Sequence, residues 1–191
     1  MARPRSDDRR AALLDAAARV FAEEGLSAPT SLISKTAGVS EGSFFTYFKT
    51  KDELLVALYR ELRLDLAAAL MGDFPRRAGV RERLEHVFTR WVAWAVANPV
   101  SRRAMRQLSL SKLVPEAVRG EGGALFGEVE RIQLDAIAQR RLGQLPPEMA
   151  AAALKAVAEM TMDLIEQKPD RAAELSAAGF QMLWGALNSK P

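Results

Sequence analysis

The stretch TSLISKTAGVSEGSFFTYFKTKDEL, residues 30–54, predicts two short helices joined by a tight turn and followed by the start of a third helix. Gly38 can adopt the positive φ that ends a helix. Ser40 is a favourable N-cap residue for the next helix. Three aromatic residues then recur at helical spacing and predict its apolar side: Phe44, Phe45 and Phe48.

Two short helices joined by a three-residue glycine turn are typical of the helix-turn-helix, whose second helix enters the major groove of DNA. Thr50 is followed three residues later by Glu53, and this capping box predicts the start of a longer helix. The stretch therefore predicts a DNA-binding module within the first third of the chain.

The rest of the chain shows apolar residues at helical spacing and no convincing strand alternation. The expected helices outside the opening stretch are, in order, those at about residues 7–24, 51–70 and 80–97, one that begins at Pro99 and ends before a break at Val114–Pro115, one that resumes at about Leu125, and two at about 148–167 and 170–187. Ser6 and Asn98 are the expected N-caps of the first and fourth of these helices. We predict an all-α fold of about nine helices, with a three-helix helix-turn-helix domain at 1–50 and a ligand-binding and dimerisation domain at 51–191.

Composition limits the functional classes. The 191 residues have a net charge of +3 and contain no cysteine and a single histidine, His86. These counts argue against a disulfide framework, a thiolate or histidine metal site and a histidine-based catalytic centre. No 18-residue apolar run and no apolar leader is present. We therefore expect a cytoplasmic protein that is not an enzyme, holds no cofactor or metal and does not enter a membrane.

Positive charge marks two possible DNA contacts. Arg3 and Arg5 form a short basic arm, which either contacts phosphates or the minor groove or is a solvated terminus. Lys51 lies in the first turn of a helix, where a cation opposes the helix dipole, and this local cost favours a phosphate-binding role. The expected second helix of the module, in contrast, contains neither Arg nor Lys, so it cannot bind guanine through a cation.

The two C-terminal helices are apolar on more than one side, and such a helix must bury both sides. Pairing with a two-fold copy would form a four-helix dimer interface. The expected dimerisation residues are Leu154, Val157, Leu164, Leu175, Met182, Leu183 and Trp184. The alternative is that both sides lie inside one monomer.

Three segments resemble the TetR family of bacterial repressors: Ala37–Ser40, Gly42–Phe45 and Phe48–Leu55. The start of the chain, the Glu41–Phe48 run and the residues around Asp163 are also similar to the multidrug-responsive RamR type. The resemblance implies a homodimer whose N-terminal helices bind an operator in double-stranded DNA. It also implies that a small effector in the larger domain moves the helix at 51–70 and releases the DNA.

The resemblance assigns phosphate contacts to Thr30, Tyr47 and Lys51. The base-facing candidates are Glu41, Gly42, Ser43 and Thr46, and specificity would be shared with Lys35 and the Arg3–Arg5 arm. Two positions depart from the family pattern. Phe45 stands where Tyr is usual, which removes a hydroxyl that could contact phosphate, and Ser34 stands where Ala is usual, in a tightly packed place.

Phe88, Trp91 and Trp94 recur on one broad side of the helix at 80–97, either as core residues or as part of a ligand pocket. With the resemblance, we expect a pocket lined by Tyr59, Leu62, Phe88, Trp91, Trp94, Met105, Phe126, Met160 and Asp163. A carboxylate buried in the apolar run around Asp163 needs a partner, and aromatic rings with one carboxylate suit a flat cationic effector.

The expected function is that of a ligand-responsive repressor that binds a palindromic operator as a dimer and is released by a small aromatic or cationic effector. An activator or nucleoid-type DNA-binding protein with the same DNA-binding module but no ligand is one alternative. Another is a helical small-molecule-binding or scaffold protein that no longer binds DNA specifically, which the neutral second helix of the module keeps open.

Overall fold

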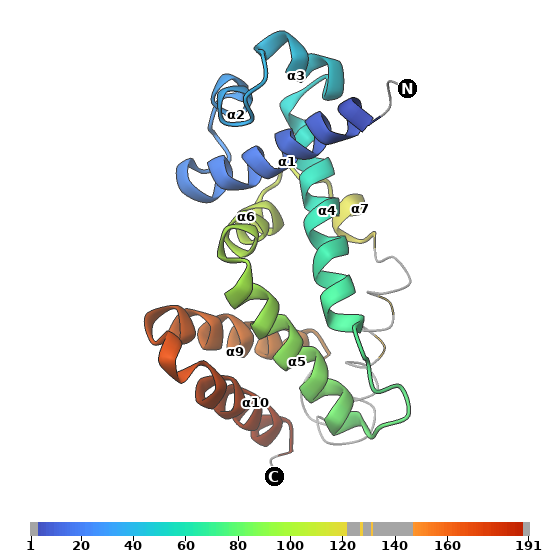
Figure 1. The fold of residues 1–191 in the computed structure, drawn as a ribbon. Helices are drawn as coiled ribbons and strands as arrows, with labels where there is room; N and C mark the ends of the chain where they lie inside the picture. The colour runs from blue at the N-terminus through green and yellow to red at the C-terminus, as the bar shows by residue number, and fades with distance from the viewer. Residues whose placement is uncertain (1–3, 122–126, 128–130, 132–146, 189–191) are drawn as a thin grey trace. The chain divides into compact units, whose positions relative to one another are not determined.

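The computed structural model describes residues 4–121, 127, 131 and 147–188. This part of the chain contains nine α-helices and one short 3-10 helix, and no strand occurs within it (Figure 1). The predicted all-α fold is confirmed. The helix expected to resume at Leu125, with Phe126, lies outside the described residues apart from isolated positions.

The chain forms two compact units. Unit 1 comprises residues 1–65 and 98–121, and unit 2 comprises residues 66–97 and 122–191. The helix α4 (Lys51–Met71) begins in unit 1 and ends in unit 2. Each unit therefore contains two separate segments of the chain. The predicted division at residue 50 separates a DNA-binding part from a ligand-binding part, and it stays a prediction about function.

Unit 1 contains the predicted helix-turn-helix. Besides the first part of α4, its helices are α1 (Pro4–Glu24), α2 (Thr30–Thr36), α3 (Glu41–Tyr47), α6 (Pro99–Leu110) and α7 (Glu116–Arg119). α1 packs against both α2 and α6 (Figure 1). A single apolar core holds these helices together, and its fully buried members include Leu13, Phe21, Ile33, Phe44 and Leu54.

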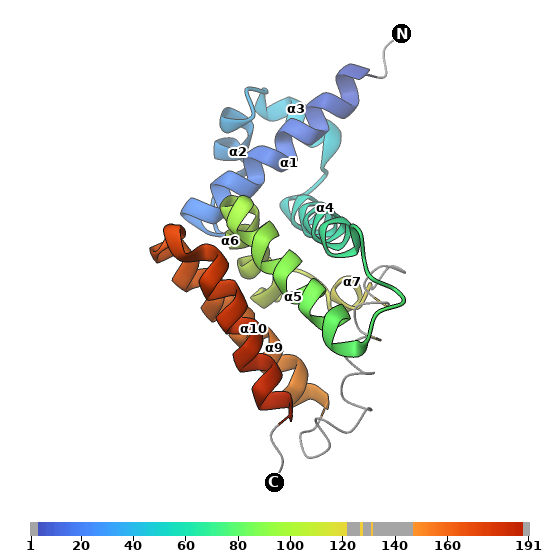
Figure 2. The same cartoon turned by 60° about the horizontal axis from the view of Figure 1, so that its bottom comes forward.

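Unit 2 is built around three long helices. They are α5 (Val80–Ala97), α9 (Pro147–Gln167) and α10 (Ala172–Asn188), with the 3-10 helix η2 (Pro169–Arg171) between the last two. All three pack against one another, and Figure 2 shows α9 and α10 running side by side. Phe88 of α5 and Phe180 of α10 are fully buried with ring centroids 5.9 Å apart, so aromatic side chains fill the space between the helices.

Gly179 lets α10 approach its neighbours closely. A Cβ at this position would lie 2.2 Å from Thr161 Oγ1 of α9 and 3.2 Å from Phe88 Cζ of α5. Thr161 is itself buried, and its hydroxyl donates to the Val157 carbonyl oxygen at 2.7 Å. The three helices therefore meet at a point where only hydrogen fits.

One predicted helix start was wrong, and one predicted cap lacks its side-chain bond. α1 begins at Pro4 rather than at Asp7, because proline has its φ preset for a first turn and lacks an N–H that would go unpaired there. Ser6 therefore lies inside the helix. Asn98 occupies the predicted N-cap position of α6, and its side chain makes no capping bond. Its carbonyl oxygen accepts from the Arg102 N–H at 2.9 Å.

Candidate nucleic-acid interface

The turn between α2 and α3 has the geometry that the sequence predicts. Gly38 has φ +68°, in the left-handed region that glycine adopts without strain. The Val39 N–H donates to the Ser34 carbonyl oxygen at 3.0 Å and closes the end of α2. Ser34 is buried, and its hydroxyl donates to the Thr30 carbonyl oxygen at 3.0 Å, so the serine in this packed place has its polar group paired.

Ser40 caps α3 as predicted. Its hydroxyl oxygen accepts from the Ser43 N–H at 3.2 Å, which satisfies one of the free donors at the helix start. Phe44 is fully buried, and its ring centroid lies 5.9 Å from that of Phe48. The cap and these two rings fix how α3 is rotated about its axis. Glu41, Phe45 and Thr46 are then exposed, whereas Tyr47 is half-buried and packs against the core.

The start of α4 is capped from both directions. The Glu53 N–H donates to Thr50 Oγ1 at 3.1 Å, and the Glu53 carboxylate accepts from the Lys49 N–H at 2.8 Å. The capping box is thus confirmed, although Glu53 reaches one residue further back than Thr50 itself. These bonds hold the turn between α3 and α4 and thereby the position of Lys51.

The predicted DNA-contacting side chains of unit 1 differ in their exposure. Those that are exposed are Lys35, Glu41, Gly42 and Thr46. Those that are half-buried are Thr30, Ser43, Tyr47 and Lys51. Arg3 lies outside the described residues, and Arg5 lies in α1 with its side chain not described. All of these positions with a described side chain thus keep some surface for a partner.

Two cations of unit 1 rest on aromatic rings of its core. Lys51 Nζ lies 5.9 Å from the ring centroid of Phe21, and the Arg10 guanidinium lies 5.4 Å from that of Phe48. No local sequence pattern predicts either interaction, because the partners are distant along the chain. Each one orients the charged group at a small energetic gain.

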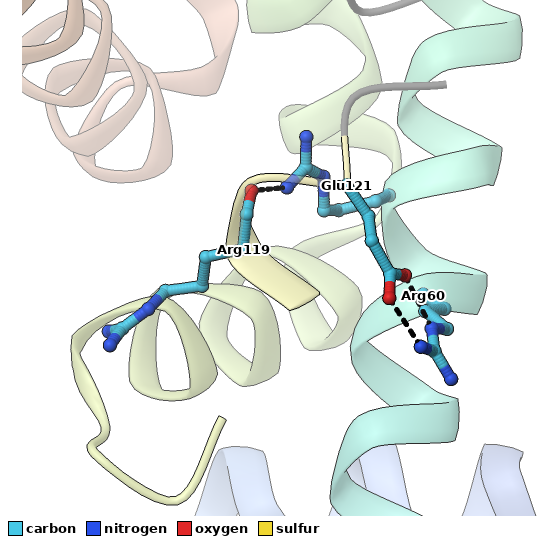
Figure 3. A network of polar contacts seen from close by, with 4 residues as sticks. Arg60, Arg119 and Glu121 are labelled. Atoms are coloured by element: carbon cyan, nitrogen blue, oxygen red, sulfur yellow. Dashed lines mark hydrogen bonds and ion pairs between the residues drawn. The ribbon is translucent and has the colours of Figure 1, made fainter. Parts of the chain in front are cut away.

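α7 is fastened to α4 by a polar network (Figure 3). The Arg60 guanidinium donates to both carboxylate oxygens of Glu121, Nε to Oε2 at 2.7 Å and Nη2 to Oε1 at 2.5 Å. Arg63 of α4 donates to the carbonyl oxygen of Arg119. The Arg60 guanidinium lowers the pKa of the Glu121 carboxyl, chiefly through their hydrogen bond. No local pattern predicts this network, because its partners lie 61 and 56 residues apart.

The residues expected to line a ligand pocket fall in both units. Tyr59, Leu62 and Met105 belong to unit 1, the first two buried and the third half-buried. Those in unit 2 are Phe88, Trp91, Trp94, Met160 and Asp163. Phe126 lies outside the described residues.

Three of the unit 2 positions differ from the expected environment. Phe88 is part of the packed core beside Phe180 and Gly179. Met160 is 42% exposed. Asp163 is half-buried rather than buried, because the side of α9 on which it lies is only partly covered by the described chain.

The residues expected at a dimer interface differ in how deeply they are buried. Leu154 and Leu183 are buried in the core of unit 2, so within one chain their surface is already covered. Val157, Leu164, Leu175 and Trp184 are half-buried, and Met182 is 48% exposed. The Trp184 ring stacks on Phe180 at a centroid distance of 6.2 Å.

The described part of the chain also bears on two other kinds of site. No group of three histidine, aspartate or glutamate side chains is placed to hold a metal ion there. Nor is any helix of that part both long enough and apolar enough to cross a lipid bilayer.

Residues 13–58 match the sequence model described as "Bacterial regulatory proteins, tetR family". This range contains α2, the glycine turn, α3 and the capped start of α4, which together form the candidate interface. The N-terminal part of the chain, residues 13–58, is thus similar to bacterial regulatory proteins of the tetR family.

Individual regulator proteins resemble this chain over different lengths. The "Fatty acid metabolism regulator protein" of Bacillus subtilis is 29% identical over 122 residues, which are 60% of this chain and 63% of that relative. The chain thus matches less than two thirds of that curated relative.

Solved structures of TetR-family proteins match along nearly the whole chain. A regulator from Marinobacter aquaeolei VT8 has a TM-score of 0.85 at 21% identity and covers 96% of this chain and 97% of its own. FadR of B. subtilis, solved in complex with stearoyl-CoA, has a TM-score of 0.66 at 20% identity, covering 94% and 97%. The two solved structures show the likeness of the fold. None of these three proteins is described as being of the RamR type, so they give no support to that subtype.

Proposed function

We propose that this chain is a ligand-responsive transcriptional repressor that binds a palindromic operator as a homodimer in the cytoplasm. The observation that carries the proposal is the capped α2–turn–α3 arrangement, which buries Phe44 and leaves Glu41, Gly42 and Thr46 on the outer side of α3. A short helix fixed in this way can enter the major groove with its exposed side chains toward the base edges.

Phosphate contacts would supply most of the affinity. Lys35 of α2 is exposed and Lys51 of α4 is half-buried, so both cations keep surface for a partner. The hydroxyls of Thr30 and Tyr47 belong to half-buried residues. Contacts of this kind position a protein on any duplex, and they weaken as salt rises because the release of bound counterions then gains less free energy. The Arg3–Arg5 arm would add further phosphate contacts and so raise the affinity for any duplex.

The salt dependence of DNA binding tests these contacts. Lys51→Ala should weaken binding to all duplexes and reduce the slope of log K against log salt by about one unit for each phosphate that is no longer neutralised, hence about two for a dimer. Lys155→Ala, which removes an exposed lysine of α9, is the matched control and should leave the slope unchanged. A weakening confined to one preferred duplex would contradict the phosphate role of Lys51.

The dimer is supported by two exposed lines of small and apolar residues in unit 2. Ala152, Ala156 and Met160 follow one another four residues apart on α9. Ala178, Met182 and Ala186 do the same on α10. A solvent-facing helix normally carries polar side chains on its outer face, whereas these lines would suit the centre of a four-helix interface between two copies.

Sedimentation equilibrium of the full chain tests the dimer. Met182→Glu would place two carboxylates in the proposed interface and should weaken dimerisation by at least about a hundredfold, the cost of burying unpaired charge. Ala173→Glu adds the same charge to an exposed position of α10 and should leave the mass unchanged. A wild-type chain that sediments as a monomer at micromolar concentration would refute this part of the proposal.

The effector is proposed to be a small molecule bound by unit 2 residues, with an aromatic cation as the first candidate. Trp91 and Asp163 are both half-buried and so keep surface that a ligand could contact. An effector that favours one position of α4 would act on the DNA-binding helices, since α4 begins in unit 1 and ends in unit 2.

A long-chain acyl-CoA is the second candidate effector. It is favoured by the 29% identity to a regulator of fatty acid metabolism, while FadR of B. subtilis shows that the same fold can hold stearoyl-CoA. An acyl-CoA carries several negative charges, so Asp163 would repel it. The two candidates therefore make opposite predictions for the same substitution.

Binding of rhodamine 6G and of stearoyl-CoA to the full chain separates the candidates. Under the first candidate, Asp163→Asn should weaken dye binding about tenfold, as expected when one carboxylate no longer attracts the cation. Glu166→Gln, at an exposed position of the same helix, is the control. Release of DNA by stearoyl-CoA alone, with Asp163→Asn neutral or favourable, would replace the first candidate by the second.

The same assays test the alternatives to a repressor. DNA binding that neither compound affects would favour a regulator without these effectors. Absence of binding to any duplex at low salt would favour a helical ligand-binding or scaffold protein. A reporter gene whose expression rises with the protein, rather than falls, would identify an activator.

A further inference from the structure

Phe45 is an exposed aromatic side chain in the middle of α3. It is 51% exposed, whereas the adjacent Phe44 is fully buried. The two rings meet edge to face, with centroids 5.2 Å apart and planes at 78°. The Phe45 ring is therefore held in place by a core residue while about half of its surface stays accessible to a partner.

The hydroxyl groups around Phe45 are already bonded within the helix. Ser43 Oγ and Ser40 Oγ are 2.8 Å apart, and Ser40 also caps the helix. Thr46 Oγ1 donates to the Gly42 carbonyl oxygen at 3.4 Å, a long bond that nevertheless turns the hydroxyl toward the helix backbone. The outer side of α3 therefore offers an aromatic ring and a threonine methyl beside one charged side chain, Glu41.

This surface suits one feature of the DNA bases. In the major groove only thymine carries a methyl group, and phenylalanine rings and threonine methyls are side chains that contact it. Phe45 has neither a hydroxyl nor a charge, so it cannot bind a phosphate oxygen. A ring held on a capped, partly buried helix also loses little rotamer entropy on binding.

We propose that Phe45, assisted by the methyl group of Thr46, contacts the 5-methyl groups of thymines in each operator half-site and thereby determines part of the sequence specificity. This inference rests on the proposed function, because it requires α3 to enter the major groove. It gives the neutral helix α3 a means of distinguishing bases without a cation. The preferred half-site carries thymine at the positions that face Phe45.

The preferred duplex is obtained by selection of the full chain on a pool of random-sequence DNA. Each thymine of the selected site is then replaced by deoxyuridine, which removes only the methyl group. One such replacement should weaken wild-type binding about fourfold, the value of one buried methyl, and replacement in both half-sites about sixteenfold. Thymines outside the selected site serve as controls and should have no effect.

Two variants assign the effect to Phe45. Phe45→Ala should bind the thymine and deoxyuridine duplexes equally and should lose the thymine preference when the selection is repeated. Leu64→Ala removes an apolar side chain of α4 that is 63% exposed, and should keep the full preference. Circular dichroism of Phe45→Ala verifies that the fold is intact.

The inference is overturned if wild-type binding is insensitive to every deoxyuridine replacement while a specific duplex is still selected. It is also overturned if Phe45→Ala retains the full sensitivity, since another side chain would then contact the methyl groups. Failure of the proposed function gives a different result, because no duplex would be enriched from the pool at all.

Discussion

Units 1 and 2 bury their apolar residues in different ways. In unit 1, α1 and α3 each turn one apolar side inward, and the other side of α3 is mostly polar apart from Phe45. In unit 2, α9 and α10 each carry one apolar line inside and a second line outside. Unit 1 thus has a core of its own, with single exposed apolar residues such as Leu64 and Leu110 outside it. Unit 2 instead carries its exposed small and apolar residues as lines along two adjacent helices, which a partner could cover.

The chain carries probes that distinguish the two units. Its three tryptophans, Trp91, Trp94 and Trp184, all belong to unit 2, and its two tyrosines, Tyr47 and Tyr59, both belong to unit 1. Tryptophan fluorescence therefore reports unfolding of unit 2. Tyrosine absorbance, after the contribution of tryptophan has been subtracted, reports unfolding of unit 1. The effects of substitutions on the two units can be compared in one sample.

The largest effect is expected from Phe44→Ala in unit 1. Removing a fully buried phenylalanine should lower the free energy of unfolding by about 3–5 kcal/mol and shift the tyrosine-detected transition to lower urea concentration. Phe45→Ala, one residue away and half-exposed, is the matched control and should change it by less than about 1 kcal/mol. Equal losses in the two variants would mean that the exposed ring belongs to the core.

Gly179→Ala should destabilise unit 2 by about 1–3 kcal/mol, because the added methyl group overlaps Thr161. The tryptophan-detected transition measures this loss. Gly185→Ala, in the same helix with open space around it, should instead stabilise unit 2 by about 0.5–1 kcal/mol.

Combining Gly179→Ala with Thr161→Ala checks the cause. Gly179→Ala should lower the free energy of unfolding by less in the Thr161→Ala variant than in the wild type. The reason is that Thr161→Ala removes the atoms nearest to the added methyl group. If Gly179→Ala destabilised both backgrounds equally, the added methyl group would clash with atoms other than those of Thr161. A tyrosine transition that moves together with the tryptophan transition would show that units 1 and 2 unfold as one cooperative body.

The smallest effect concerns two exposed ion pairs. Arg60 lowers the pKa of Glu121 in unit 1, and Arg171 lowers that of Glu174 in unit 2, in each case chiefly by a hydrogen bond. A lowered pKa in the folded state means that the pair stabilises the fold near neutral pH. This contribution is lost as the pH falls through the pKa of the folded state.

NMR titration of the carboxyl groups measures both shifts. Arg60→Ala should raise the pKa of Glu121 toward its ordinary value and leave Glu174 unchanged, and Arg171→Ala should do the reverse. Because Arg60 and Glu121 are 61 residues apart, their shift should vanish when unit 1 unfolds. A Glu121 pKa unaffected by Arg60→Ala would contradict the network in Figure 3.

Local signals in the sequence predicted much of the DNA-binding module. The glycine at 38, the serine cap at 40 and the Thr50–Glu53 pair each act within four residues, so their bonds form wherever the helices form. The spacing of apolar residues in 80–97 also predicted where α5 begins and ends. The start of α1 was missed because Pro4 and Ser6 are both acceptable at a helix start.

The candidate ligand and dimer residues could be predicted only in part. Periodicity shows that α9 and α10 have two apolar sides, but it does not tell which side meets α5. The fold places Leu154 and Leu183 inside and Met160 and Met182 outside. The deciding contact is Gly179 against Thr161, which depends on how closely two helices approach and has no counterpart in either helix alone.

The sequence by itself determined the all-α class and the turn that sets α3, because these depend on short-range bonds and on the spacing of apolar residues. Only the tertiary structure decided that Phe45 is exposed beside a buried Phe44, that Arg60 meets Glu121, and which sides of α9 and α10 are covered. Burial is a property of the surroundings of a side chain. Those surroundings are formed by residues far away along the chain, so local sequence patterns do not predict them.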